Sequence, residues 1–258
     1  MLRNTFCHIS GISPQKELSL WIDGVDSWDE FFKRKNDSLI NSLSVNQLAS
    51  ISDELLKSMR AVEREEFSLF KSLPRNQHWR VYDHLKHKAC FLDIETTGLS
   101  KRRHDVTLVG IHSAEGTKIF MKDKNLDDFK HELEKFDVIV TFNGSCFDLP
   151  FLKQKFPDLT LNQFHLDLRF LMARLGYRGG LKSVEIDLGI SRPDELEGVD
   201  GFEAVRLWRK FEKGDLSALQ KLEKYLVADV ENLKILMDFT YVELKKELFY
   251  KLSAISKS

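Results

Sequence analysis

Apolar residues follow two different spacings along the chain, and the spacing changes near residue 88. Before that point they recur every three or four residues, as over residues 48–62, which predicts amphipathic helices. After it, short apolar runs such as Ala89–Ile94 and Val138–Phe142 alternate with amphipathic stretches, which predicts buried strands between helices. Strands that alternate with helices are typical of an α/β sheet domain. We therefore expect such a domain over residues 88–252 and a small helical N-terminal region over residues 1–75.

The same spacings and the turn residues place the other elements of the second region. Glu115–Gly116 predicts the turn of a hairpin, and Asp215 predicts a helix N-cap. The expected elements are strands over 106–111, 117–121 and 163–166, and helices over 126–135, 148–156, 204–211 and 216–252, with another helix beginning at Leu168.

Composition and charge narrow the class of protein. The chain has 258 residues, of which 42% are hydrophobic and 31% charged, and this balance is typical of a globular protein with a proper core. Its 39 Lys and Arg against 40 Asp and Glu exclude bulk attraction to nucleic acid or membrane but leave room for a local basic groove. There is no run of about 18 apolar residues and no signal peptide, so no membrane partner is expected. Three distant cysteines without a CxxC pair indicate reduced thiols and a cytoplasmic location.

Two carboxylates share one face at the end of a predicted strand. Because strand side chains alternate, Asp93 and Glu95 project on one face, and Leu92 and Ile94 project into the core. Neighbouring carboxylates repel each other, and their desolvation is costly unless a cation lies between them. The pair is therefore either a site for a hard cation such as Mg²⁺ or Mn²⁺, or an ordinary solvated strand end.

Further acids lie where they can join the same site. Asp148 follows a predicted strand and a glycine turn, which places it at the C-terminal edge of the sheet, either in a site or as a helix N-cap. Tyr225 and Asp229 are four residues apart and share one helix face, which is either part of the site or exposed. Asp167 is either an outer carboxylate of the site or a structural residue, and His165 beside apolar residues is more often structural.

The order of these residues resembles the three motifs of the DEDD exonucleases. The matching segments are Asp93–Leu99, Asn143–Asp148 and Tyr225-x-x-x-Asp229, and the tyrosine four residues before the last aspartate resembles the DEDDy branch. A finer resemblance is to the YprB-type ribonuclease H-like domains and covers residues 88 to about 240. The segments that carry it are Leu181–Glu185, Leu188–Ile190 and Leu207–Trp208, and at the N-terminus Phe6–Ile12, Leu20–Trp21 and Ser27–Asp29.

This resemblance implies an RNase H-like mixed sheet flanked by helices, and a 3′–5′ exonuclease acting on single-stranded ends of DNA or RNA. It also implies two divalent metal ions, Mg²⁺ or Mn²⁺, bound by Asp93, Glu95, Asp148 and Asp229, with Asp93 as the bridging ligand. Two metals about 4 Å apart can stabilise the attacking and leaving oxygens of an in-line displacement. Tyr225 would orient the attacking water, since a phenol with an unperturbed pKa of about 10 is a poor base.

The same resemblance suggests contacts to the nucleic acid. The residues expected to approach the terminal nucleotide are Thr96, Thr97, Leu99, Asn143 and Phe147. Phe147 either stacks on a base or packs under the second motif. Basic residues cluster in Lys101–His104 and around the Gly176–Gly180 loop, where Lys182 is a candidate for tracking the phosphate backbone; solvated loops are the alternative.

Two questions stay open at the level of sequence. The N-terminal run with Gly11 and Ile12 resembles a helix-hairpin-helix phosphate loop, but Ser13 replaces the expected second glycine, and a plain helix cap is the alternative. The alternatives to an exonuclease are a non-catalytic nucleic-acid-binding module and a structure-specific or RNase H-type endonuclease with the same metals. The choice between DNA and RNA depends on contacts to the 2′-hydroxyl, which no residue reveals.

Overall fold

The computed structural model describes residues 1–35, 43–196 and 198–255, which form two compact units. The first unit comprises Met1–His84 and Tyr241–Ser258, and the second comprises Leu85–Thr240. The N-terminal region predicted over residues 1–75 falls within the first unit. None of the helices in the described ranges combines the length and the apolarity needed to cross a membrane.

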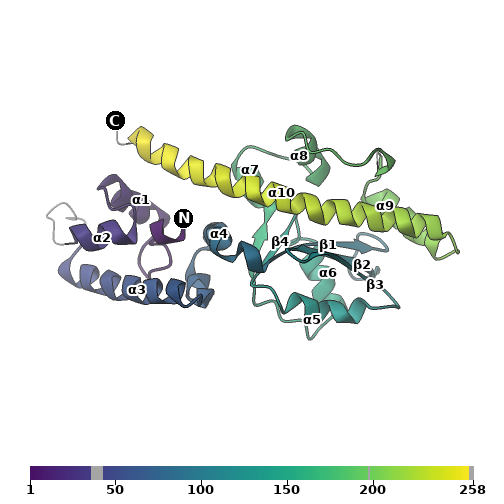
Figure 1. Cartoon of the computed structure of the whole chain (residues 1–258), viewed down its shortest axis with the longest axis horizontal. Helices are drawn as coiled ribbons and strands as arrows, with labels where there is room; N and C mark the ends of the chain where they lie inside the picture. Colours follow the sequence, from purple (N-terminus) through teal and green to yellow (C-terminus); the bar gives the residue numbers. More distant parts are fainter. Residues whose placement is uncertain (36–42, 197, 256–258) are drawn as a thin grey trace. The chain divides into compact units, whose positions relative to one another are not determined.

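The first unit is helical, as its hydrophobic spacing predicted (Figure 1). Its N-terminal part contains the helices α1 (Pro14–Ile22), α2 (Trp28–Arg34), α3 (Val45–Glu63) and α4 (Tyr82–Leu85), the last of which ends at the boundary of the unit, with 3₁₀ turns at Leu2–Asn4, Phe67–Ser72 and Arg75–Val81. Serines begin three of them: the side chains of Ser13, Ser27 and Ser44 each accept a hydrogen bond from a backbone N–H of the first turn. Ser13 therefore caps α1.

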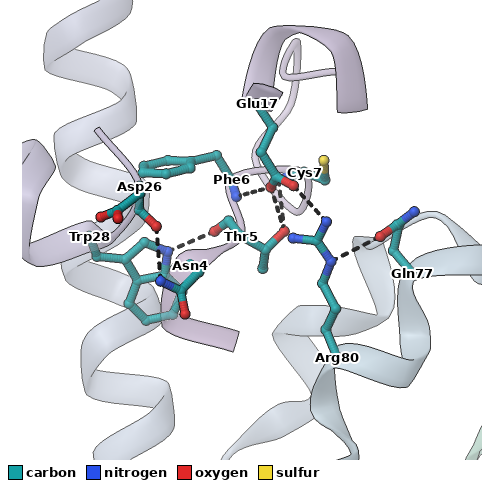
Figure 2. Close-up of polar contacts among 9 residues, drawn as sticks. All are labelled: Asn4, Thr5, Phe6, Cys7, Glu17, Asp26, Trp28, Gln77 and Arg80. Atoms are coloured by element: carbon teal, nitrogen blue, oxygen red, sulfur yellow. Dashed lines mark hydrogen bonds and ion pairs between the residues drawn. The ribbon is translucent and has the colours of Figure 1, made fainter. Parts of the chain in front are cut away.

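A buried ion pair holds the first unit together (Figure 2). Arg80 Nη2 lies 2.7 Å from Glu17 Oε1, and both side chains are almost fully buried. The other carboxylate oxygen of Glu17 accepts hydrogen bonds from Thr5 Oγ1 at 2.7 Å and from the backbone N–H of Phe6 at 2.6 Å. Arg80 Nε donates to Gln77 Oε1 at 2.8 Å. The N-terminal segment is thus fastened to α1 and to the 3₁₀ turn that carries Arg80.

The second unit contains a mixed sheet, which confirms the α/β class. Within the described residues its five strands lie in the order β3-β2-β1-β4-β5. The central strand β1 pairs antiparallel with β2, which pairs antiparallel with β3, and pairs parallel with β4, which pairs parallel with β5. The strands are β1 (Ala89–Thr96), β2 (Val106–Ser113), β3 (Gly116–Met121), β4 (Val138–Thr141) and β5 (Phe164–Asp167).

Helices cover both faces of this sheet (Figure 1). On one face, Leu92 and Ile94 of β1 pack with α5 (Phe129–Leu133) and α6 (Asp148–Lys155). On the other face lie α9 (Gly201–Phe211) and α10 (Leu216–Ile255), whose Leu222, Leu226 and Val230 pack with Leu108 of β2. The remaining helices are α7 (Leu168–Arg174) and α8 (Leu181–Asp187), with 3₁₀ turns at Lys86–Lys88, Leu126–Asp128 and Asp194–Leu196.

The structure corrects the prediction of one helix over residues 126–135. The structure has a 3₁₀ turn at Leu126–Asp128, followed by only five α-helical residues, Phe129–Leu133. Tight 3₁₀ turns are common at helix ends, and they satisfy the terminal backbone groups within a short connection.

One glycine lets α10 lie close to the sheet. Gly110 of β2 is the register partner of Asp93 in β1. A Cβ atom at Gly110 would lie 2.8 Å from Leu226 Cγ and 3.1 Å from Val230 Cγ1, so a larger residue would push the helix away. The close approach matters because the acidic face of β1 is turned toward this helix.

Candidate metal centre

The strand β1 and the helix α10 bring three predicted ligands together. Asp93 and Glu95 project from the same face of β1, and Asp229 comes from α10, 134 positions further along the chain than Glu95. One carboxylate oxygen of each lies within 4.8 Å of the others. Glu95 and Asp229 are buried, and Asp93 is half-buried. The alternation along β1 thus directs acids and core residues to opposite sides of the sheet, as the sequence pattern indicates.

The fourth acid, Asp148, is the first residue of α6 and is also buried. A hydrogen bond with the backbone of Ile94, the residue between Asp93 and Glu95, joins it to β1. Its charge raises the pKa of both Asp93 and Glu95. The structure therefore places all four predicted carboxylates in one electrostatic cluster, which we call the acidic cluster: Asp93, Glu95, Asp148 and Asp229.

Burial, followed by mutual repulsion, disfavours the charged forms of these acids. Desolvation raises the pKa of Asp93 and Glu95 well above their usual range, and the neighbouring carboxylates raise it further. Burial also raises the pKa of Asp148 to about 7 and that of Asp229 to about 6. Charged acids are not kept buried together without compensation. The acidic cluster therefore fits divalent cations, and its hard oxygen donors suit Mg²⁺ or Mn²⁺.

The cation in contact with the cluster is Arg192, which sequence reasoning missed. Its Nη2 atom lies 2.5 Å from Asp229 Oδ1. The guanidinium is fixed by Glu185 of α8, through Nε at 2.6 Å and Nη2 at 2.7 Å. Asn232 Nδ2 donates to the same Glu185 carboxylate at 2.9 Å. Because the charge of Arg192 is shared with buried Glu185, Arg192 alone cannot neutralise the four carboxylates of the cluster when they are ionised.

Tyr225 lies one helical turn before Asp229 and is 7% exposed. Burial, and then the negative charges of Asp229, Glu95 and Asp93, raise the pKa of its hydroxyl far above the usual range. Two cations face its ring: Lys182 Nζ is 4.7 Å and the Arg192 guanidinium carbon 5.4 Å from the ring centroid. The phenol therefore stays protonated beside the cluster, in a form that can donate a hydrogen bond but is a poor base.

The loop that carries the second motif is held by Asp167. The Asp167 carboxylate accepts hydrogen bonds from the backbone N–H groups of Asn143, at 2.8 Å, and Ser145, at 3.0 Å, and from the Ser145 hydroxyl. Asn143 adopts a positive φ of 66°, and its side-chain oxygen accepts a hydrogen bond from Arg169 at 2.6 Å. His165 contacts Thr141 Oγ1 at 2.9 Å. Asp167 thus has a structural part in positioning Asp148.

The predicted substrate contacts lie in different surroundings. Thr96 is buried, and its hydroxyl donates to the Gly98 carbonyl at 2.8 Å. Thr97 Oγ1 accepts a hydrogen bond from the backbone N–H of Asp105 at 3.0 Å. Leu99 is 64% exposed, so it is available to a ligand. Phe147 packs against Phe151 with ring centroids 4.7 Å apart and adjoins the core on the α6 side of the sheet.

Lys182 lies beside a cavity of about 500 Å³. The cavity is formed by α8 and the segment that follows it, and Arg192, Ile186 and Ile190 also line it. Among the described residues, Lys182 makes no ion pair, while burial and then the charge of Arg192 lower the pKa of its ammonium. It is a cation at the rim of the acidic cluster.

A family model described as the RNase H superfamily matches residues 90–241. The uncharacterized protein MJ0365 of Methanocaldococcus jannaschii is 33% identical over 173 residues, which span 59% of this chain and 97% of that protein.

Three solved structures are similar in fold. The family B DNA polymerase of Pyrobaculum calidifontis has a TM-score of 0.46 and 18% identity, and the match covers 62% of this chain and 24% of that chain. NrnC of Brucella melitensis with bound Mg²⁺ has a TM-score of 0.45 and 20% identity, and the match covers 68% of this chain and 83% of that chain. The Nibbler EXO domain of Aedes aegypti has a TM-score of 0.37 and 11% identity, and the match covers 70% of this chain and 92% of that chain. The chain spans about a quarter of the length of the polymerase.

Proposed function

The chain belongs to the RNase H superfamily, and from that premise we propose that it is a metal-dependent 3′–5′ exonuclease of the DEDDy branch, with a YprB-type domain. The observation that carries the proposal is the acidic cluster. Four carboxylates from β1, α6 and α10 converge on one buried place, although they are spread over more than 130 residues of sequence. A core without a ligand has no physical reason to gather them.

The metal ligands in this proposal are Asp93, Glu95, Asp148 and Asp229. Four carboxylates balance the charge of two divalent cations, which agrees with a two-metal site. When bound, such ions lower the pKa of a coordinated water and neutralise charge on the phosphate. Tyr225, whose hydroxyl stays protonated and lies one helical turn from Asp229, donates a hydrogen bond that orients the attacking water.

The substrate is a single-stranded end of DNA or RNA in the cytoplasm. In this proposal Leu99, which is exposed, contacts the terminal base, and Lys182 contacts a backbone phosphate. In this proposal Thr96 and Thr97 shape the loop after β1 through local hydrogen bonds, and Asn143 joins its loop to Arg169 of α7. Phe147 supports the second motif by packing beneath it.

The test is a time course with purified protein, Mg²⁺ or Mn²⁺, and matched single-stranded DNA and RNA, each labelled at the 5′ end. We expect a descending ladder on one polymer, and its loss in Asp93→Asn by a factor of about 10³ or more. Asp158→Asn is the matched control, because Asp158 is exposed and pairs with Lys130 on the surface. Equal cleavage by pure, folded Asp93→Asn protein would contradict the proposal.

Further arms of the same experiment test the finer assignments. Tyr225→Phe should lower kcat more than it weakens substrate binding, because it removes a hydrogen bond to the attacking water. A circular strand should resist the protein, whereas its cleavage would assign an endonuclease. Measurable binding of a strand with no cleavage and no metal uptake would assign a non-catalytic binding module.

A further inference from the structure

Arg192 occupies an unusual position for a cation near a metal centre. It contacts Asp229 directly, so it lies against one of the proposed ligands rather than at the substrate entrance. Its side chain is 11% exposed, and Glu185 is 2% exposed. A guanidinium this buried, and shared between two carboxylates, is a permanent part of the centre.

The chain holds this guanidinium so that it cannot swing away. Glu185 binds it with two parallel hydrogen bonds, and Asn232 of α10 secures the Glu185 carboxylate in turn. The Tyr225 ring lies against the guanidinium at 5.4 Å. Movement would break the bidentate pair and leave two buried carboxylates unpaired, which is costly.

We propose that Arg192 serves as the resident counter-ion of the acidic cluster. It makes the metal-free cluster tolerable by pairing with Asp229, and it weakens the binding of the cation that Asp229 holds. The opposing effects have one cause: a fixed positive charge stabilises nearby carboxylates and repels an incoming cation. The metal part of this inference rests on the proposed function, whereas the pairing with Asp229 in the metal-free protein does not.

A metal titration distinguishes a counter-ion from a scaffold residue. Removing a counter-ion tightens Mn²⁺ binding, whereas removing a residue that only holds Asp229 in place weakens it. We expect Arg192→Gln to bind Mn²⁺ at least about tenfold more tightly by calorimetry. Weaker or unchanged Mn²⁺ binding in a folded variant overturns the proposal.

Matched variants separate charge from packing. Arg192→Lys keeps a cation, so its Mn²⁺ affinity should stay closer to that of the wild type than to that of Arg192→Gln. Arg206→Gln is the control, because Arg206 is exposed and pairs with Glu203 on the surface of α9. If Arg192→Gln does not fold because Glu185 is left unpaired, the double variant Glu185→Gln/Arg192→Gln removes that unpaired charge at position 185 and should also bind Mn²⁺ more tightly.

The metal-free protein gives an independent readout. In EDTA, Arg192→Gln should lower the melting temperature by about 5 °C or more, because Asp229 loses its cation. Adding Asp229→Asn should restore more stability in the Arg192→Gln protein than the same change gives in the wild type. Absence of this coupling would contradict the proposal that Arg192 is the counter-ion of Asp229. If wild-type protein takes up no Mn²⁺ but shows the coupling, the proposed function fails and the counter-ion stands.

Discussion

The two units each bury charged groups, and they balance the charge in opposite ways. In the first, Glu17 has one carboxylate oxygen paired with Arg80 and the other bound by hydrogen-bond donors of the N-terminal segment (Figure 2). In the second, one of the four carboxylates, Asp229, contacts a guanidinium that Glu185 already neutralises in part. Burial of charge is common to both, so burial alone does not identify a functional site. The difference lies in whether the protein's own groups complete the balance.

This difference predicts opposite responses to the removal of a charge. Taking one partner from a balanced pair leaves an unpaired buried ion and destabilises the fold. Taking one carboxylate from an excess relieves repulsion and stabilises the metal-free fold. The following experiments apply that contrast, beginning with the largest expected change in free energy.

Arg80→Met should destabilise the first unit by about 3–5 kcal/mol, because Glu17 would stay buried without its cation. Urea unfolding followed by the fluorescence of Trp21 and Trp79, which face the Arg80 guanidinium, measures the effect. Arg3→Met is the control, since its pair with Asp29 is exposed and its loss should cost under about 1 kcal/mol. Equal costs for the two variants would remove the distinction between buried and exposed pairs.

Asp148→Asn should, in contrast, stabilise the second unit when no metal is present. In EDTA at pH 8, it should raise the free energy of unfolding by about 2–4 kcal/mol, because a carboxyl with its pKa raised from 3.8 to about 7 is unfavourable when charged. Saturating Mg²⁺ should abolish this gain, since the wild type then has its cations. Melting curves with and without Mg²⁺ measure both effects, and a loss of stability in EDTA would contradict the excess of charge.

The two units should also depend on pH in opposite directions when metal is removed. Asp148 has a folded pKa of about 7, so the folded state keeps a proton that the unfolded state loses, and stability of the second unit falls as pH rises from about 4 to 7. Burial lowers the pKa of His8 in the first unit from 6.5 to about 4, so stability of that unit falls as pH drops through this range. The free energy of unfolding of each unit is expected to change by about 2 kcal/mol. Hydrogen exchange at pH 5.5 and 7.5, analysed by segment, compares them, and the same direction in both units would refute the contrast.

The smallest effect concerns Lys182, a cation that forms no carboxylate pair among the described residues. Lys182→Ala should weaken binding of a single-stranded oligonucleotide about fivefold and reduce the salt dependence by about one ion. Binding is measured in the Asp93→Asn background, where the strand is not cut. Lys224→Ala is the control, because Lys224 is exposed and already pairs with Glu195. Equal losses in the two variants would remove Lys182 from the proposed path of the strand.

Local patterns predicted much of the fold. The alternation in β1, the hairpin around Glu115–Gly116 and the long helix after Asp215 follow from side-chain spacing and turn chemistry, and the structure confirms them. The convergence of Asp93 with Asp229 was expected from the motif resemblance rather than from spacing. It depends on tertiary packing, including the close approach of α10 that Gly110 permits.

Arg192 and Asp167 show where sequence reasoning stops. Arg192 follows α8 in an irregular segment with no periodic pattern, and its partner Asp229 is 37 residues away. Only the folded chain brings them together. Asp167 was ambiguous because its partners, the backbone N–H groups of Asn143 and Ser145, leave no mark in the sequence. In related chains, the corresponding signal is an arginine seven residues after a glutamate, as in Glu185 and Arg192.

The helix α10 has a consequence for how the protein is made. It carries Tyr225 and Asp229 in the second unit, and from Tyr241 onward its residues belong to the first, where Tyr241 packs against Trp79 and Tyr82. A ribosome releases residues 1–84 first but supplies Tyr241 only after the whole second unit. Domains generally fold in the order of their synthesis. Here the N-terminal unit is the last to be completed. Until the C-terminal part of α10 is synthesised, Trp79 and Tyr82 lack their contact with Tyr241.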